Sequence, residues 1–274
     1  MSAALEAVLA RMPRREGVYQ LSAAEPYEAK ETRYWRVRAR EFRLYSDEIV
    51  RGLPEVPADH PLRGEWEARA DSLGRLADHV ARFWQDISVL DLGCGNGWMA
   101  HQLAAISVRI RVYGLDLNRR ELTQAARVFV DKPRVKFLYG DVFTAALPAR
   151  AFDVVVLASA IQYFPDLPAL VRRLLALTAP GGEIHILDSP LYAPRAVPAA
   201  RARTAAYYKS KGLAFMAEEY HHHTWAALAE FRPEVLYNPA APLNRLARWW
   251  WAEQGRSPFP WLRITVPPDS RPSG

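Results

Sequence analysis

Residues 88–98 read Ser-Val-Leu-Asp-Leu-Gly-Cys-Gly-Asn-Gly-Trp, and this stretch decides the fold. An apolar run ends in three glycines at every second position, Gly93, Gly95 and Gly97. The pattern predicts a strand that ends in a sharp turn and leads into a helix over about residues 98–105. Glycine supplies positive φ angles and lets a ligand approach the backbone, while the free N–H groups at a helix start attract anions. We therefore expect this loop to hold a carboxylate or a phosphate.

The spacing of the glycines distinguishes between kinds of loop. A dinucleotide-binding loop reads G-x-G-x-x-G, and a P-loop reads G-x-x-x-x-G-K-[ST]. Here the spacing is G-x-G-x-G, with Asp91 two residues before the first glycine and no lysine after the last. The stretch resembles the first motif, D-x-G-x-G-x-G, of the class I S-adenosylmethionine-dependent methyltransferases. The spacing argues against a nicotinamide-dependent oxidoreductase.

The composition fits one globular domain with additions. The chain has 274 residues, a formal net charge of +6 and a single cysteine, Cys94, which excludes an internal disulfide. No apolar run approaches the ~20 residues of a membrane helix, and residues 1–20 have no apolar core typical of a signal peptide, so we expect a cytoplasmic protein. No Lys/Arg block of five or more occurs, so nucleic acid is not an expected partner. The oligomeric state is left open.

Strands and helices alternate after residue 87, which indicates a doubly wound α/β sheet. The resemblance implies a Rossmann-like methyltransferase fold with a mostly parallel seven-stranded sheet and covers residues 87–266. A turn at Pro180-Gly181-Gly182 is expected to end the helix before the fifth strand. The expected strands span 89–92, 109–115, 135–139, 152–157, 183–187, 234–237 and 261–266, and the expected helices span 98–105, 120–130 and 167–177.

The rest of the chain is expected to surround this domain. Residues 1–86 would form an N-terminal helical cap, with helices over about 30–44 and 65–83, which either packs on the core or closes over the active site as a lid. Residues 189–225 would form a substrate-lid insertion within the domain of residues 87–266. Residues 267–274 would be a loose tail.

Acidic residues follow the second and third expected strands, where open α/β sheets bind their ligands. Asp116 lies 25 residues after Asp91 (116 − 91 = 25) and can either accept both ribose hydroxyls of a nucleoside or cap the next helix. Asp141 can either bind a ligand or cap a turn. Asp91 itself can either support the loop or orient the cofactor's amino group.

The resemblance implies S-adenosylmethionine as cofactor, with S-adenosylhomocysteine as the product. The backbone of Gly93–Gly97 would then face the methionyl carboxylate, Asp116 the ribose and Asp141 the adenine amino group. Val142 and Phe143 would lie beside the adenine, and Leu117 would pack on its other side. The expected cofactor-binding residues are Asp91, Gly93, Cys94, Gly95, Gly97, Asp116, Leu117, Asp141, Val142, Phe143, Ala158 and Ser159.

The segment after the fourth expected strand bears on the substrate. Residues 158–163 read Ala-Ser-Ala-Ile-Gln-Tyr, whereas enzymes of this fold that methylate DNA bases carry [DN]-P-P-[YF] there. The sequence resembles small-molecule methyltransferases, including quinone-type and natural-product enzymes, so we expect a small-molecule acceptor, which can be hydrophobic. An RNA or protein methyltransferase and a cofactor-binding scaffold without turnover are the alternatives.

Candidate catalytic residues lie in the expected insertion and after the fourth strand. His221, His222 and His223 form a run of three, of which His221 and His223 would share a face in extended backbone. The alternative roles of these histidines are a general base, a residue that holds the substrate, a pair of metal ligands, or part of an ordinary surface loop. Metal ranks last because the stretch lacks a third ligand, and we expect no metal. Thr224 is expected to cap a helix over 225–231. Tyr163, Gln162 and Asp188 are further candidates for contact with substrate, with turn capping or packing as the alternative role of each.

Three consecutive tryptophans, Trp249 to Trp251, lie in a basic stretch near the C-terminus. They span nearly a full helical turn, so at least one would face away from a core. The pattern fits packing with one exposed aromatic side chain, or peripheral contact with a membrane surface.

Overall fold

The computed structural model of the chain describes residues 3–24, 27–241 and 256–269. Trp249 to Trp251 lie outside the described residues. None of the described helices has the length and apolarity that crossing a membrane requires.

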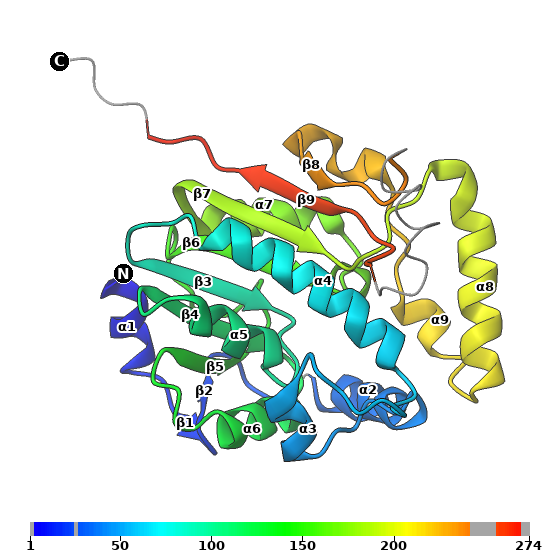
Figure 1. Cartoon of the computed structure of the whole chain (residues 1–274), viewed down its shortest axis with the longest axis horizontal. Helices are drawn as coiled ribbons and strands as arrows, with labels where there is room; N and C mark the ends of the chain where they lie inside the picture. The colour runs from blue at the N-terminus through cyan, green and yellow to red at the C-terminus, as the bar shows by residue number, and fades with distance from the viewer. Residues whose placement is uncertain (1–2, 25–26, 242–255, 270–274) are drawn as a thin grey trace.

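The fold is a twisted sheet between two layers of helices (Figure 1). The described strands follow the order β1-β2-β5-β4-β3-β6-β7-β9-β8. Strands β2 to β7 run parallel, and β9 is antiparallel to both β7 and β8. The strands are β1 (Arg14–Arg15), β2 (Val18–Gln20), β3 (Ile87–Leu92), β4 (Ile110–Asp116), β5 (Val135–Tyr139), β6 (Phe152–Ala158), β7 (Thr178–Leu187), β8 (Glu234–Tyr237) and β9 (Trp261–Thr265).

The expected α/β class is confirmed, and the sheet is larger than expected. All seven expected strands are present, as β3 to β9. Two more, β1 and β2, come from the first thirty residues and extend the sheet beyond β5. The N-terminal segment therefore contributes to the sheet as well as to the helices around it.

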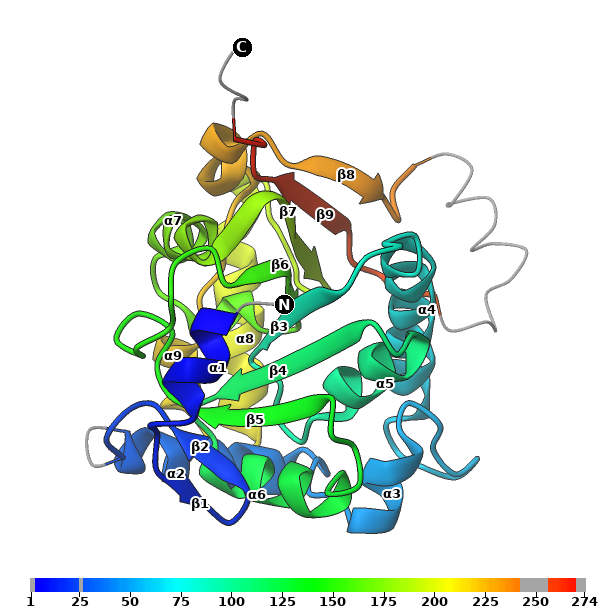
Figure 2. The same cartoon turned by 90° about the vertical axis from the view of Figure 1, so that its left-hand side faces the viewer.

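Helices cover both faces of the sheet, and each face buries its own apolar cluster. Figure 2 shows α4 and α5 on one side and α1 and α7 on the other. The first cluster joins Trp66 and Leu103 to Val89 of the central strand, and the second joins Leu5 and Leu170 to its neighbour Leu90. Successive residues of β3 thus point into opposite layers, and the whole strand is buried, as expected for the centre of a parallel sheet.

Further helices gather beyond the carboxyl ends of the parallel strands (Figure 1). There Val37 of α2 packs with Tyr208 of α8 and Met216 of α9 in a third apolar cluster. We call this group of helices the roof. The helices are α1 (Ala3–Leu9), α2 (Glu28–Arg40), α3 (Asp47–Gly52), α4 (Arg63–Val80), α5 (Trp98–Ile106), α6 (Arg119–Val128), α7 (Leu167–Leu177), α8 (Val197–Ser210) and α9 (Met216–Glu219), with 3₁₀ turns η1 (Ile161–Tyr163), η2 (Pro194–Ala196) and η3 (Trp225–Phe231).

Two local expectations were wrong. Pro180-Gly181-Gly182 lies inside β7 instead of in a turn, because β7 starts at Thr178, directly after α7. The backbone of β6 comes so close there that a Cβ at Gly182 would lie 2.6 Å from the carbonyl oxygen of Asp153. The segment after Thr224 is the 3₁₀ turn η3, and the Thr224 side chain makes no capping hydrogen bond.

Candidate functional site

The glycine loop joins β3 to α5 in a conformation that only glycine adopts without strain. Gly93, Gly95 and Gly97 have φ angles of 78°, 52° and 75°. Gly97 also packs closely, since a Cβ there would lie 2.9 Å from the Cβ of Ala125 and would overlap the ring of Phe137. The predicted strand–turn–helix is therefore present, and its shape depends on all three glycines.

Asp116, at the end of β4, fixes this loop from the neighbouring strand. Its Oδ2 accepts the backbone N–H of Gly95 at 2.8 Å, and its Oδ1 accepts that of Asn118 at 2.8 Å. Burial, followed by the nearby Glu121 carboxylate, raises the pKa of Asp116 to about 6. The alternative role as a helix cap is wrong, because the Asn118 side chain caps α6.

Asp91 is buried beneath the loop, near the end of β3. One of its oxygens, Oδ2, has no hydrogen-bond partner. Burial, followed by the charge of Asp116, raises the pKa of Asp91 to about 7. An acidic group with one free oxygen thus lies directly behind the glycine loop.

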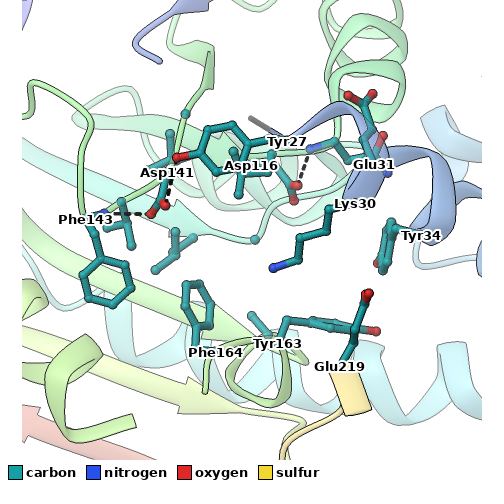
Figure 3. A pocket seen from close by; sticks show the side chains of 18 of the residues that line it. Tyr27, Lys30, Glu31, Tyr34, Asp116, Asp141, Phe143, Tyr163, Phe164 and Glu219 are labelled. Atoms are coloured by element: carbon teal, nitrogen blue, oxygen red, sulfur yellow. Dashed lines mark hydrogen bonds between the residues drawn. The ribbon is translucent and has the colours of Figure 1, made fainter. Parts of the chain in front are cut away.

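A first cavity of about 350 Å³ opens at the ends of β4 and β5 (Figure 3). Asp141 lies on its wall, where its Oδ1 accepts the N–H of Phe143 at 3.0 Å and its Oδ2 accepts the Tyr27 hydroxyl at 3.1 Å. Lys30 extends into the space between Asp116 and Tyr163. We call this space the β4–β5 cavity. Its lining also includes Leu117, Val142, Phe143, Ser159, Ala160, Phe164, Met216 and Glu219.

A second cavity, of about 380 Å³, opens on the side of β6 and β7. We call it the β6–β7 cavity. Its wall combines the glycine loop with charged and aromatic side chains from α2, α4, α8 and the ends of β6 and β7. The two cavities share five lining residues: Tyr34, Gly93, Asp116, Ser159 and Tyr163.

The remaining expected cofactor residues divide between the two cavities. Leu117, Val142 and Phe143 line the β4–β5 cavity, whereas Cys94 and Ala158 line the β6–β7 cavity. Cys94 is buried in a slot beside β4, where a Cβ on Gly114 would lie 2.8 Å from its Sγ. Burial raises the pKa of the Cys94 thiol well above its usual value, so packing is the role its surroundings favour.

The structure does not bring the three histidines into either cavity. The Nε2 of His223 donates to the carbonyl of Ile161 at 3.0 Å, and His222 hydrogen-bonds through Nε2 to Thr204 at 2.9 Å. His221 and His223 do share a face, with ring centroids 6.4 Å apart. None of the three is among the residues that line the cavities. Their contacts link η1, α8 and the loop, which favours a structural role, and a role as a base or in holding the substrate stays a prediction.

Tyr163, in contrast, lies where the cavities meet. Its ring packs edge-on against Tyr34 of α2, with centroids 5.5 Å apart, and burial raises the pKa of its hydroxyl. It therefore connects the end of β6 to the roof.

Helix α2 supplies site residues that the sequence had not revealed. Tyr27, Glu31 and Tyr34 line the β4–β5 cavity, and Arg38, one turn further along, lines the β6–β7 cavity. Arg38 forms a buried ion pair of 2.5 Å with Glu121. These positions follow an i, i+4, i+7, i+11 spacing that places them on one helix face. This spacing is the sequence pattern from which their shared position could have been predicted.

One group among the described side chains has the geometry of a metal site, away from both cavities. Ligand atoms of His79, Glu183 and His185 lie within 4.8 Å of one another. The indole N–H of Trp261 donates to Nδ1 of His185 at 3.1 Å, so the ring proton of His185 is on Nε2 and points to Glu183. Burial acts to raise the pKa of Glu183. Hydrogen bonds from both histidines outweigh this effect and hold the pKa at about 2. The group is best described as a hydrogen-bond network between α4 and β7.

Comparisons with known proteins agree with this geometry. A family model described as "Methyltransferase domain" matches residues 89–182. An uncharacterized methyltransferase of Mycobacterium bovis is 36% identical over 100 residues, which are 36% of this chain and 49% of the relative. Trans-aconitate 2-methyltransferase of Variovorax paradoxus is 36% identical over 145 residues, which are 53% of this chain and 47% of the relative. The chain thus spans about half the length of these curated relatives.

A solved structure shows the same fold over most of the chain. Geranyl diphosphate C-methyltransferase from Streptomyces coelicolor superposes with a TM-score of 0.56 at 14% identity, covering 90% of this chain and 99% of that one. The matched residues 89–182 contain the glycine loop, Asp116 and Asp141. The match to the methyltransferase domain over residues 89–182, together with the shared fold, supports the resemblance to the class I S-adenosylmethionine-dependent methyltransferases.

Proposed function

We propose that this protein transfers the methyl group of S-adenosylmethionine to a small-molecule acceptor by in-line displacement. The observation that carries the proposal is the pair of contiguous cavities. They meet at Gly93, Asp116, Ser159 and Tyr163, at the point where the winding of the sheet reverses between β3 and β6. One cavity suits the nucleoside and the other suits the acceptor, and the methyl group would be transferred where they join.

The residues of the β4–β5 cavity fit an adenosine group. Asp116 would accept the ribose hydroxyls, and Asp141 would lie near the adenine amino group. Leu117, Val142 and Phe143 supply apolar surface for the ring. Both carboxylates are already oriented by donors from the protein, which lowers the cost of ordering them when the cofactor binds.

The glycine loop would hold the methionyl end. Its three glycines have no side chains to cover the backbone, and the loop leads directly into the N-terminus of α5. Bound S-adenosylmethionine supplies a sulfonium-activated methyl group and leaves as S-adenosylhomocysteine. We assign Asp91 to supporting the loop from behind, since it lines neither large cavity.

The chain's own contribution to the reaction would be alignment and exclusion of water. The roof of α2, α8 and α9 covers the carboxyl edge of the sheet, so residues 1–86 and 189–225 would act together as a lid. Tyr163, which contacts α2 at the junction of the cavities, would position the acceptor.

The name of one relative and the lining of the β6–β7 cavity support the acceptor class. A relative that matches over 53% of this chain is named a trans-aconitate 2-methyltransferase, which supports a small-molecule acceptor. A hydrophobic, quinone-like or natural-product acceptor is compatible with the tyrosines of the β6–β7 cavity.

The test uses S-adenosylmethionine labelled on its methyl group. Cell extract is incubated with the protein and separated into nucleic acid, protein, lipid and small-molecule fractions, with the Asp116→Ala variant as the blank. We expect label in the small-molecule or lipid fraction. Label in RNA or protein would overturn the acceptor class, and cofactor binding without label in any fraction would favour a scaffold without turnover.

A further inference from the structure

Two residues that line the β6–β7 cavity each carry a buried polar atom without a partner. Among its described lining residues these are Oδ2 of Asp188 and Oε1 of Gln162. Asp188 is 6% exposed and Gln162 is 7% exposed, so bulk water does not readily solvate either group. A buried acceptor without a donor costs free energy, and a ligand that supplies the donor removes that cost.

The carboxylate of Asp188 is held in a fixed orientation. Its Oδ1 accepts two hydroxyl groups, from Ser72 of α4 at 2.6 Å and from Ser257 at 2.9 Å. These bonds occupy one oxygen and leave the other free. Because Ser72 and Ser257 come from distant parts of the chain, the orientation is set by the folded structure as a whole.

The amide of Gln162 is oriented by a single contact. Its Nε2 donates to the carbonyl of Ser159 at 2.7 Å. A carbonyl accepts only from the nitrogen of the amide, so the oxygen of Gln162 is the atom left without a partner.

Ser159 joins the two groups through strained backbone. Ser159 and Asp188 end neighbouring parallel strands and have φ angles of 53° and 49°, which non-glycine residues rarely adopt. The Ser159 hydroxyl donates to the carbonyl of Asp188 at 2.9 Å, and its N–H donates to Leu187 at 3.1 Å. This strain is maintained by specific bonds and fixes both free acceptors beside the glycine loop.

We propose that Gln162 and Asp188 bind the methyl-accepting atom and that this atom is an amine nitrogen. The inference rests on the proposed function and names its substrate class. A neutral primary amine has two N–H donors and one lone pair. These two donors equal the free oxygens in number, and the lone pair remains available for the methyl group. A hydroxyl has only one O–H and would leave one acceptor without a partner.

The transfer balances with no further reactant. The nitrogen lone pair forms the new N–C bond while the C–S bond breaks, and its electron pair stays on sulfur. The positive charge of the sulfonium is thereby moved to nitrogen, beside the carboxylate of Asp188. The methylated ammonium then leaves, or gives one proton to solvent.

The experiment compares three probes of similar shape: benzylamine, benzyl alcohol and toluene. Their ring suits the aromatic wall, which includes Tyr207, Tyr208 and Phe259. Binding is measured by ligand-observed NMR at pH 10, where benzylamine is largely the neutral amine that the proposal requires, with the protein saturated with S-adenosylhomocysteine. We expect benzylamine to bind at least about tenfold more tightly than toluene, the scale of a hydrogen bond to a charged group, with benzyl alcohol between them.

Two variants test the assignment to these side chains. Asp188→Asn replaces the free acceptor with a donor and should abolish the preference for benzylamine, while Gln162→Met should reduce it. Asp166→Asn serves as the matched control, because Asp166 caps α7 on the surface and asparagine caps equally well. It should leave the preference unchanged.

The outcomes separate this inference from the proposed function. Equal binding of the three probes, a preference for the alcohol, or an unchanged preference in Asp188→Asn would each overturn the amine assignment, as would failure of all three to bind. Failure of the unmodified protein to bind S-adenosylhomocysteine would instead overturn the proposed function. If Asp188→Asn does not fold, as judged by loss of that binding, Gln162→Met decides the assignment.

Discussion

The β4–β5 and β6–β7 cavities share a wall but differ in how their polar groups are satisfied. In the β4–β5 cavity, each oxygen of Asp116 and Asp141 already accepts a hydrogen bond from the protein. In the β6–β7 cavity, Asp188 and Gln162 each keep one oxygen without a partner. A carboxylate oxygen can accept more than one donor, so the first pair is oriented in advance and can still receive a ligand. The second pair is complete only when a ligand is present.

The two cavities should therefore respond differently to substitution. Changes in the first should act on cofactor affinity, and changes in the second on the choice of acceptor. The glycine loop borders both, so damage to it should affect both alike.

The largest effect is expected for Gly97→Ala. The left-handed conformation costs an alanine about 1–2 kcal/mol, and overlap with Phe137 and Ala125 adds about 1–3 kcal/mol. We expect the free energy of unfolding to fall by about 3 kcal/mol or more, with cofactor binding lost, as measured by denaturant titration and calorimetry.

Gly181→Ala is the matched control for this change. Gly181 has a φ of 77°, and nothing lies within 4 Å of the added Cβ. Only the conformational cost of about 1–2 kcal/mol should appear, with cofactor affinity unchanged. Equal losses for the two variants would show that the packing of Gly97 on Phe137 is unimportant.

The next effect is expected for Asp116→Ala, which removes an acceptor for the ribose. Affinity for S-adenosylmethionine should fall by about 1.5–3 kcal/mol, the scale of a hydrogen bond to a charged group. Calorimetry measures this directly, and an unchanged affinity would remove Asp116 from the ribose site.

The pH dependence of the unmodified protein provides an independent check. The pKa of Asp116 is about 6, so its carboxylate is charged at pH 8 and becomes protonated as the pH falls through 6. Affinity should be about tenfold lower one unit below that pKa than at pH 8. The Asp116→Ala variant should show a flatter profile.

Asp91→Asn should change the free energy of unfolding by a similar amount, but this substitution should stabilise the protein. The pKa of Asp91 is about 7 in the folded protein, well above its unfolded value, so its charge destabilises the fold above pH 7. Asparagine removes that charge and should raise the free energy of unfolding at pH 8 by about 2–4 kcal/mol, the upper figure being the full cost of a pKa raised from 3.8 to about 7. The gain should shrink as the pH falls and disappear below about 4, where Asp91 is protonated in the unfolded state as well.

Denaturant titrations at pH 8 and pH 5 measure the effect of this substitution. Asp166→Asn, on the surface, should change stability at neither pH. A variant that is no more stable at pH 8 would indicate that the charge of Asp91 has a partner in solution.

The smallest effect is expected for Tyr27→Phe, which removes one donor to Asp141. Stability should fall by about 0.5–1.5 kcal/mol, while the N–H of Phe143 still orients the carboxylate. Cofactor affinity should change by less than about threefold, a difference of under 1 kcal/mol. A loss of tenfold or more in calorimetry would place Tyr27 in direct contact with the ligand.

The sequence predicted the part of the β4–β5 cavity that lies at the strand ends, because that part is local. The glycine loop, Asp116 and Asp141 each follow directly after a strand of a parallel sheet, and parallel strands bring their carboxyl ends to one edge. Knowledge of the strands was therefore enough to bring these residues together. The same reasoning gave all seven strands of the domain.

In the β6–β7 cavity, the sequence indicated Gln162, Tyr163 and Asp188 from their positions after strands, but not how they are held, because distant segments build this cavity. Ser72, Gln162, Asp188 and Ser257 come from four elements, and the bonds between them exist only in the folded chain. The three consecutive histidines were candidate catalytic residues because histidine often acts as a base. Their burial against Ile161 and Thr204 depends on the path of the chain after β7, which no periodicity reveals.

The two extra strands affect how the sheet ends. β2 covers the edge of β5, and β1 finishes the sheet with two exposed arginines, Arg14 and Arg15. A short, charged outermost strand discourages the addition of a strand from another molecule. A chain shortened to begin after β2 would leave the apolar strand β5 uncovered, and self-association would then compete with folding. The N-terminal residues thus protect the protein from aggregation, in addition to leading the chain into the lid.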